Sequence, residues 1–287
     1  MILANSTRVR LRAVAGAKIA NTVTVEPADI TDPTAIAKVL DTHAITNVVH
    51  LAALQIPFCR TDPRLGASVN VAGTVNVFEA VRDRIDQISG VTYASSAALF
   101  GPGDDDLAAH NEIGTGARPG TLYGVYKQAN EGSARIYWEE NRVPSIGLRP
   151  HTVYGPGRDQ GVTSAQTVAI GAAVRGERYT IPFGGFSIYN FAADTAAAFI
   201  ASSRSLSEGA HVFNIPGQRL DMPEVIATIE NSVEGADMLI DYDESVVLPI
   251  PDTLATGGLK KQLGELPITP FEDGIRATTD HFRAAAD

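Results

Sequence analysis

The chain has 287 residues and a formal net charge of −10 at pH 7, with 44% hydrophobic and 20% charged residues. These proportions are typical of a globular protein with a substantial core. The negative charge argues against nucleic acid as a partner, because it repels a phosphate backbone and no basic patch is interleaved with aromatic residues. No run of eighteen apolar residues occurs, so no membrane span is expected.

The single cysteine, Cys59, excludes an internal disulfide. The six histidines are spread along the chain without the spacing of a helical metal site. We therefore expect no metal site and a reducing, cytoplasmic setting.

The first twenty-five residues are basic, and the first acidic residue is Glu26. We expect residues 1–4 to be the remnant of a strand and a polar loop to follow. An organelle transit peptide, which is also basic and poor in acids, is the alternative interpretation.

Strands and helices are predicted to alternate along the rest of the chain. Residues 22–28 alternate β-branched residues like a buried strand. Asp32 and Pro33 are typical of the N-cap and first turn of a helix that extends to about residue 40. In chain order, the further predicted elements are a strand at 47–53, a helix at 63–86, a strand at 91–96, a loop at 101–120, a helix at 121–141, a strand at 145–148, a turn at 154–157, a helix at 164–175, strands near Tyr179 and Ile188, a helix at 194–203, a strand at 211–215, a helix from Met222, a strand near Leu239, and helices near Leu259 and Gly274.

This alternation predicts the α/β class, with a doubly wound parallel sheet and a smaller C-terminal α/β lobe. We assign residues 1–160 and about 188–216 to the domain with the sheet, and about 161–187 and 217–287 to the lobe. In such sheets, ligands bind at the carboxyl ends of the strands, where the loops gather.

Tyr123 and Lys127 lie four residues apart on a predicted helix and therefore share one face. An ammonium group next to a phenol favours the phenolate and lowers the tyrosine pKa from its usual value near ~10. Tyr123 is therefore a candidate general acid or base. Taken alone, a pair with this spacing is more often part of a solvated helix face.

Two serines, Ser95 and Ser96, end the strand predicted at 91–96. At the carboxyl edge of the sheet, a hydroxyl can hydrogen-bond a substrate oxygen while the phenol transfers a proton. Taken alone, the serines are more typical of a strand end that caps its own backbone.

Six segments, in this order, resemble the extended short-chain dehydrogenase/reductase superfamily in its epimerase/dehydratase branch. The resemblance covers nearly the whole chain, and it implies a Rossmann-like domain for a nicotinamide cofactor and a lobe for the substrate. The six segments are DITD (29–32), VVHLAA (48–53), NVAGTVNVFEA (70–80), YASSAALFG (93–101), YGVYK (123–127) and LRPHTVYGPG (148–157).

The resemblance implies that Tyr123 is the acid/base, that Lys127 lowers its pKa and holds the nicotinamide ribose, and that Ser96 positions the substrate oxygen. The cofactor would be NAD, with NADP not excluded, and it would carry the hydride. A homodimer through the helices that contain Asn70 and Tyr123 is expected. The implied cofactor-binding residues are Asp29, Ile30, Leu51, Ala52, Ala53, Asn70, Tyr123, Lys127, Pro150, His151 and Thr152, and the implied substrate residues are Gln55, Ser95, Ala97 and Tyr154.

The family's N-terminal strand, Gly-x-x-Gly-x-x-Gly turn and helix have no counterpart here, although they receive the cofactor's pyrophosphate. Gly16 is the only glycine before Gly66. A start codon assigned too late, a shortened chain and a natural loss of cofactor binding are three explanations, and the intact Ser/Tyr/Lys set favours the first two. If residues 1–4 were the second strand, Asn5 would lie near the ribose. We expect the missing central strand to leave exposed apolar edges.

The substrate side also departs from the family's pattern. Enzymes of this branch that act on nucleotide sugars carry an arginine for the diphosphate where this chain has Ser187, and an asparagine where it has Thr152. A nucleotide sugar is therefore disfavoured. Tyr126 is either a packing residue or a substrate contact, and His151 is either packed or a second proton carrier.

Three functions remain open at this stage. The first is NAD(P)-dependent hydride transfer at a secondary alcohol or ketone of a small polyhydroxylated compound, such as a sugar, sugar acid or lactone, with oxidation or epimerisation as the outcome. The second is a nucleotide-sugar 4-epimerase or dehydratase. The third is a non-catalytic relative that has lost its cofactor.

Overall fold

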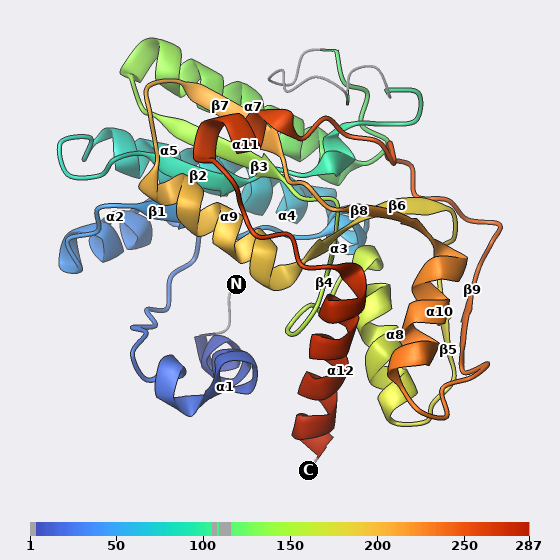
Figure 1. Ribbon diagram of the computed structural model, residues 1–287. Coiled ribbons are helices and arrows are strands. Elements are labelled where there is room, and N and C mark those ends of the chain that lie inside the picture. Colours follow the sequence, from blue (N-terminus) through green and yellow to red (C-terminus); the bar gives the residue numbers. More distant parts are fainter. Residues whose placement is uncertain (1–3, 105–107, 109–115, 287) are drawn as a thin grey trace.

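A four-stranded parallel sheet forms the centre of the protein. The computed structural model describes residues 4–104, 108 and 116–286, and Figure 1 shows the sheet between two layers of helices. Every pair of neighbouring strands in this sheet is parallel, as predicted. The strands follow the order β1-β2-β3-β7, with β1 at Val48–His50, β2 at Val91–Ala94, β3 at Ser145–Arg149 and β7 at Ala210–Asn214.

Helices cover both faces of this sheet, because its strands are apolar on both sides. On one face, Phe78 and Tyr93 belong to a core that α2, α5 and α7 share with β2. On the other face, Ile146 and Phe199 belong to a core between β3, β7, α9 and α11. The arrangement is the doubly wound, Rossmann-like class that the sequence predicts. The covering helices are α2 (Pro33–Thr42), α5 (Gly73–Arg82), α7 (Leu122–Asn141), α9 (Ala192–Arg204) and α11 (Gly257–Leu263).

The remaining elements form smaller sheets and a separate helical core. Tyr154 lies in this core, and its ring centroid is 4.9 Å from that of Phe271. The elements are the sheet of β4 (Thr152–Tyr154), β6 (Phe186–Phe191) and β8 (Gln218–Asp221), the pair β5 (Tyr179–Ile181) and β9 (Ile240–Tyr242), and the helices α8 (Ala165–Val174), α10 (Met222–Ser232) and α12 (Phe271–Ala286). The exact division of the chain into sheet domain and lobe stays a prediction.

Local side chains explain several helix ends. The Asp32 carboxylate accepts hydrogen bonds from the N–H groups of Thr34 and Ala35 and so caps α2, as predicted. Thr121 caps α7 in the same way through Gly124 N at 3.1 Å. These caps start two helices at the positions that the sequence indicates.

The helix predicted at 63–86 is made of three consecutive pieces. They are α4 (Pro63–Ala67), a π-helical turn η1 (Ser68–Ala72) and α5, which ends at Arg82. The wider turn surrounds Asn70, whose side chain bonds both the N–H and the C=O of Leu54 at 2.7 and 2.8 Å. A π-turn adds one residue per turn and re-aims the side chains around it, which periodicity alone does not reveal.

Two predictions for the N-terminal segment are wrong. The loop predicted after residue 4 is the helix α1 (Ala4–Ala20), kinked at Gly16, while residues 1–3 of the predicted strand lie outside the described residues. The strand predicted at 22–28 is an irregular segment. A strand needs a hydrogen-bonded neighbour, and no described strand lies beside the outer edge of β1.

The outer edge of β1 exposes apolar side chains, as the sequence predicts. Val49 and Leu51 expose 40% and 56% of their surface. In most parallel sheets such residues are covered on both sides. Within the described part of the fold, this edge of the central sheet is thus open to solvent.

The described part of the chain has neither a membrane-spanning helix nor a metal-binding cluster. No helix there is both long and apolar enough to cross a membrane. No cluster of three or more His, Cys, Asp or Glu side chains there could hold a metal ion.

Candidate active site

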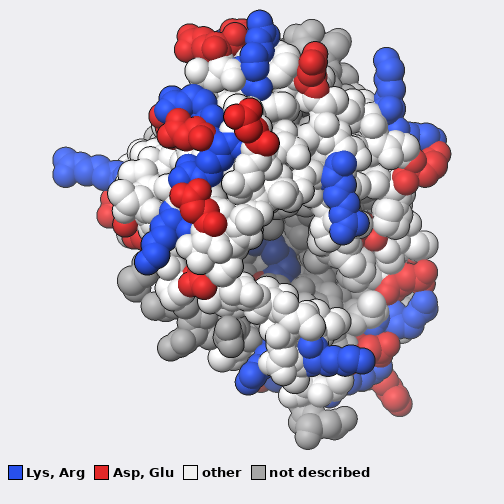
Figure 2. Space-filling model, turned by 90° about the vertical axis from the view of Figure 1, so that its left-hand side faces the viewer, with Lys and Arg blue, Asp and Glu red and all other residues white. Residues whose placement is uncertain are grey.

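A cavity of about 540 Å³ lies at the carboxyl ends of β1, β2 and β3. Its wall includes Leu51 after β1, Ser96 after β2, and Pro150 after β3. Figure 2 shows a hollow on one face of the molecule with a Lys or Arg side chain visible inside it. The cavity is thus at the edge where parallel sheets of this class bind ligands.

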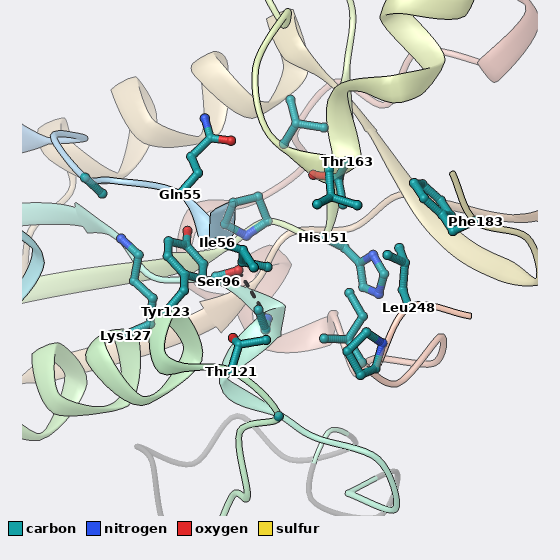
Figure 3. Close-up of a pocket in the computed structure, with 18 of the residues that line it drawn as sticks. Gln55, Ile56, Ser96, Thr121, Tyr123, Lys127, His151, Thr163, Phe183 and Leu248 are labelled. Atoms are coloured by element: carbon teal, nitrogen blue, oxygen red, sulfur yellow. Dashed lines mark hydrogen bonds between the residues drawn. The ribbon is translucent and has the colours of Figure 1, made fainter. Parts of the chain in front are cut away.

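Ser96, Tyr123 and Lys127 meet on one side of this cavity (Figure 3). The Ser96 hydroxyl accepts a hydrogen bond from Ala98 N–H at 3.1 Å and acts to lower the pKa of the Tyr123 phenol. Lys127 Nζ donates to the carbonyl oxygen of Ala94 at 2.5 Å and lies 5.5 Å from the centroid of the Tyr123 ring. The three side chains come from the end of β2 and from the first turns of α7, which the Thr121 cap holds beside the sheet.

Burial dominates the electrostatics of this group. It raises the pKa of Tyr123, while the hydrogen bond from Ser96 and the cation of Arg158 act in the opposite direction. Burial also lowers the pKa of Lys127 to about 8. The Lys127 ammonium donates to the Ala94 carbonyl, and the expectation that it lowers the pKa of Tyr123 stays a prediction.

A buried ion pair supports this group from behind. Arg149 forms two hydrogen bonds to Glu131, from Nε to Oε1 at 2.7 Å and from one terminal NH2 group to Oε2 at 2.6 Å, and both side chains are fully buried. The hydroxyl of Ser95 donates a short hydrogen bond to the same carboxylate. Glu131 lies one turn after Lys127 on α7, so the pair joins this helix to the ends of β2 and β3.

The structure brings nine of the residues expected at the site to the cavity and leaves seven elsewhere. The nine lining residues are Leu51, Ala53, Gln55, Ser95, Ser96, Tyr123, Lys127, Pro150 and His151. The seven that do not line it are Asp29, Ile30, Ala52, Asn70, Ala97, Thr152 and Tyr154.

Three of the seven have contacts within the protein, and their role toward a cofactor stays a prediction. The carboxylate of Asp29 accepts hydrogen bonds from the N–H and hydroxyl of Thr31 at 2.9 and 2.8 Å. Ile30 packs so closely against Gly73 that a Cβ there would lie 2.9 Å from it. Asn70 supports the loop after β1 through Leu54.

Three more of the seven residues, Ala97, Thr152 and Tyr154, are held inside the fold. Ala97 is fully buried, and its N–H donates to Pro150 O at 3.0 Å. Thr152 is hydrogen-bonded to Ser187 at 2.6 Å. Tyr154, expected at the substrate, is buried against aromatic residues of the second core, so its ring does not reach the cavity. Tyr126 is buried, and its hydroxyl donates to Pro63 O at 2.9 Å. This favours the interpretation of Tyr126 as a packing residue.

His151 lines the cavity with both ring nitrogens engaged. A carbonyl cannot donate, so Nε2 carries the proton that is shared with Pro251 O at 2.9 Å, and Nδ1 faces the hydroxyl of Thr152 at 3.1 Å. Burial lowers its pKa to about 4. The neutral imidazole is therefore a fixed part of the wall, which favours the packed interpretation over a second proton carrier.

His50 is a second buried histidine held neutral. Thr74 donates its hydroxyl proton to Asn70 O at 2.7 Å, so His50 Nε2 is the donor in its 2.9 Å bond to Thr74. Burial lowers the pKa of His50 to about 3.

Acid is expected to destabilise the protein through these two histidines. Unfolded, each imidazole binds a proton near pH 6.5, whereas the folded pKa values are about 3 for His50 and about 4 for His151. The unfolded chain therefore binds more protons than the folded chain between pH 6.5 and 4. As the pH is lowered through this range, the free energy of unfolding should fall by about 1.4 kcal/mol per pH unit for each histidine. Urea unfolding at a series of pH values measures this slope. His151→Gln should remove about half of it, and equal stability at pH 7 and pH 5 would contradict the assignment.

Several cavity residues were not predicted from the sequence. Arg158 and Thr163 enter the cavity from the segment after β4, Thr121 from the start of α7, and Phe183 from the end of β5. An apolar segment, residues 246–250, covers one wall. The signal for Arg158 was its place directly after the predicted YGPG turn, but nothing in the spacing showed that its side chain turns inward.

A nicotinamide cofactor fits one end of this site and lacks its usual partner at the other. Lys127 lines the cavity and uses one of its three N–H donors on Ala94 O, so donors remain for ribose hydroxyls. No Gly-x-x-Gly-x-x-Gly segment occurs in the sequence to cradle a pyrophosphate. The residues present thus suit the reacting half of the cofactor.

The fold and the cavity define a Rossmann-like α/β protein with a ligand site at the carboxyl edge of its sheet. The chain belongs to the NAD-dependent epimerase/dehydratase family, whose model matches residues 4–215. The family predicted from the six sequence segments is therefore confirmed.

Comparison with individual proteins gives lower similarity. UDP-glucuronate 4-epimerase 5 of Arabidopsis thaliana is 32% identical over 135 residues, which are 47% of this chain and 30% of that protein. The match thus spans less than a third of that curated relative. An L-threonine dehydrogenase of Cupriavidus necator, solved in its holo form, is 25% identical with a TM-score of 0.77, covering 92% of this chain and 86% of that chain. UDP-glucose 4-epimerase of Thermus thermophilus, solved with NAD, is 24% identical with a TM-score of 0.74, covering 90% of this chain and 84% of that chain.

Proposed function

We propose that this protein is an NAD-dependent oxidoreductase of the epimerase/dehydratase type that acts on a secondary alcohol or ketone of a small compound. The observation that carries the proposal is the meeting of Ser96, Tyr123 and Lys127 on one cavity at the carboxyl edge of the sheet. NADP as the cofactor is the alternative.

The chain's own residues handle the proton in the proposed reaction. When bound, the nicotinamide supplies or accepts the hydride. In the oxidation direction, Tyr123 must be ionised, and its phenolate oxygen takes the proton of the substrate hydroxyl; in reduction, the phenol gives its proton to the carbonyl oxygen. Ser96 hydrogen-bonds the same substrate oxygen and orients it. Lys127 uses one N–H group on Ala94 O and donates to the ribose hydroxyls with its other two.

The substrate that we favour is a small polyhydroxylated compound, such as a sugar, sugar acid or lactone. Gln55, Thr121 and Thr163 offer amide and hydroxyl partners on the cavity wall. The position that carries an arginine in nucleotide-sugar enzymes of this branch is Ser187, whose hydroxyl is buried against Thr152 at 2.6 Å. A diphosphate would find no fork-shaped cation at that position.

The second candidate is a nucleotide-sugar 4-epimerase. It is favoured by the similarity to UDP-glucuronate 4-epimerase 5 and by the shared fold with UDP-glucose 4-epimerase. A thermal-shift panel separates the two candidates. Free sugar acids should raise the melting temperature of the protein, whereas stabilisation by UDP- and dTDP-sugars alone would overturn our preference.

We also propose a homodimer through the helices that contain Asn70 and Tyr123. Helix α7 exposes Leu122, Val125 and Ile136 by 38–45% of their surface. Apolar side chains on one long helix are typical of such an interface. Sedimentation or light scattering should give twice the monomer mass.

A further inference from the structure

Arg158 lies in the cavity without an ion-pair partner among the described residues. Its backbone follows a turn in which Gly157 has a φ of 82°, a conformation that favours glycine. Its side chain lines the cavity together with Gln55 and Thr163. Within the described part of the chain, the ion pairs include none between a carboxylate and the Arg158 guanidinium.

Much of the hydrogen-bonding capacity of this guanidinium is unused. A guanidinium offers five N–H donors in a planar fork. One terminal NH2 group donates to Thr163 Oγ1 at 3.1 Å, while the buried Nε has no partner among the residues that the structure describes. Burial lowers the pKa of Arg158 more than Tyr123 and the neighbouring Asp159 raise it, so its positive charge is held in surroundings that favour an added anion.

Gln55 lies close to Arg158 in the cavity wall. A Cβ on Gly161 would lie 1.7 Å from Gln55 Oε1 and 3.7 Å from the terminal nitrogen of Arg158. Glycine at 161 therefore lets the amide, the guanidinium and the Thr163 hydroxyl lie together. This subsite is made of one cation and two neutral polar groups.

The Arg158 subsite and the reacting group line the same cavity. The Arg158 cation is close enough to lower the pKa of the Tyr123 phenol. The other cations on the cavity wall are placed differently, since Lys127 donates to Ala94 O and Arg60 is exposed. Arg158 is therefore the cation available to a charged group that is bonded close to the reacting carbon.

Among the described residues, those on the far wall are uncharged. Figure 3 shows Phe183 and Leu248 across the cavity from Tyr123 and Lys127. The wall continues with the apolar segment 246–250. An anionic substrate thus has one orientation in which its charge meets the guanidinium.

We propose that Arg158, with Gln55 and Thr163 beside it, binds a carboxylate of the substrate, so that the substrate class is a hydroxy acid or keto acid. This inference rests on the proposed function and narrows it. The flat fork of the guanidinium matches the two carboxylate oxygens. Held in this way, the hydroxyl or carbonyl on a neighbouring carbon faces Tyr123 and Ser96.

Calorimetric titration tests the subsite without requiring turnover. The ligands are 3-hydroxybutyrate and its neutral amide, which share one carbon skeleton, and each is titrated into the full chain with and without NAD. The acid should bind about 10- to 100-fold more tightly than the amide, because a charge-assisted pair replaces neutral contacts. Arg158→Gln should remove this preference, Arg158→Lys should keep part of it, and Arg64→Gln, an exposed arginine outside the cavity, should leave it unchanged.

The outcomes separate the inference from the proposed function. Equal affinity for acid and amide, a preference that survives Arg158→Gln, or no binding of either ligand would overturn the subsite. Reduction of NAD with neutral secondary alcohols but without any preference for acids would leave the proposed function standing and defeat the inference. Arg158-dependent binding of the acid without formation of NADH from any alcohol would support the subsite and defeat the proposed function.

Discussion

Replacing Tyr123 by phenylalanine is expected to lower turnover by a factor of about 100 to 10,000, the range that a positioned general acid or base contributes. The phenol is the group that exchanges a proton with the substrate oxygen, and phenylalanine keeps the ring while removing that proton. The affinity for the cofactor should stay nearly unchanged, because Lys127 remains in place on Ala94 O. Steady-state kinetics together with a cofactor titration measure both quantities.

Tyr126 provides a matched control for this substitution. It lies on the same helix, and its hydroxyl donates to Pro63 O at 2.9 Å, away from the Ser96 hydroxyl. Tyr126→Phe should leave turnover within a few-fold of the wild type, since it removes one neutral hydrogen bond worth about 0.5–1.5 kcal/mol of stability. Turnover that survives in Tyr123→Phe would show that another group transfers the proton.

Replacing Glu131 by glutamine is expected to reduce the free energy of unfolding by about 3–5 kcal/mol, the usual effect of removing one partner of a buried ion pair. The amide keeps the shape of the carboxylate but removes the negative charge that pairs with the fully buried Arg149. It also weakens the acceptor for Ser95, which lies next to Ser96 at the site. Urea unfolding measures the change.

Glu139 is the control for Glu131. It lies on the same helix and pairs with Arg135 one turn away, but both side chains are about half exposed. Glu139→Gln should cost only about 0.3–0.5 kcal/mol, because solvent screens the pair. If the two variants unfold at the same urea concentration, the buried pair does not stabilise the protein as described here.

Local signals were strong enough to predict most elements of the sheet domain. Asp32 and Pro33 start a helix at the position that their capping and φ preferences predict, and the apolar segments at β1 and β2 are neighbouring parallel strands. The prediction of a strand at 22–28 was wrong because alternating side chains indicate strand propensity but do not show whether a neighbouring strand is present. The π-turn at Asn70 was not predicted, because the hydrophobic periodicity of a long helix hardly changes when one turn has a single extra residue.

The candidate site was partly readable from the sequence. The spacing of Tyr123 and Lys127 places them on one helix face, whereas their place beside Ser96 in one site was implied by the resemblance of the six segments to the family. Tyr154 was expected at the substrate because the resemblance places its strand and turn beside the nicotinamide, yet tertiary packing against Phe271 holds it in the second core. Arg158 was missed because its inward direction depends on contacts with Thr163 that are formed only in the folded chain.

The most direct test of the proposed function is the absorbance of reduced nicotinamide when the full chain is mixed with NAD and a panel of small hydroxy acids and sugar acids. We expect NADH to accumulate with at least one acid, and Tyr123→Phe to abolish this signal while Tyr126→Phe keeps it. An unchanged absorbance across the whole panel, together with no bound NAD after equilibrium dialysis, would contradict the proposal and favour a relative without catalytic activity.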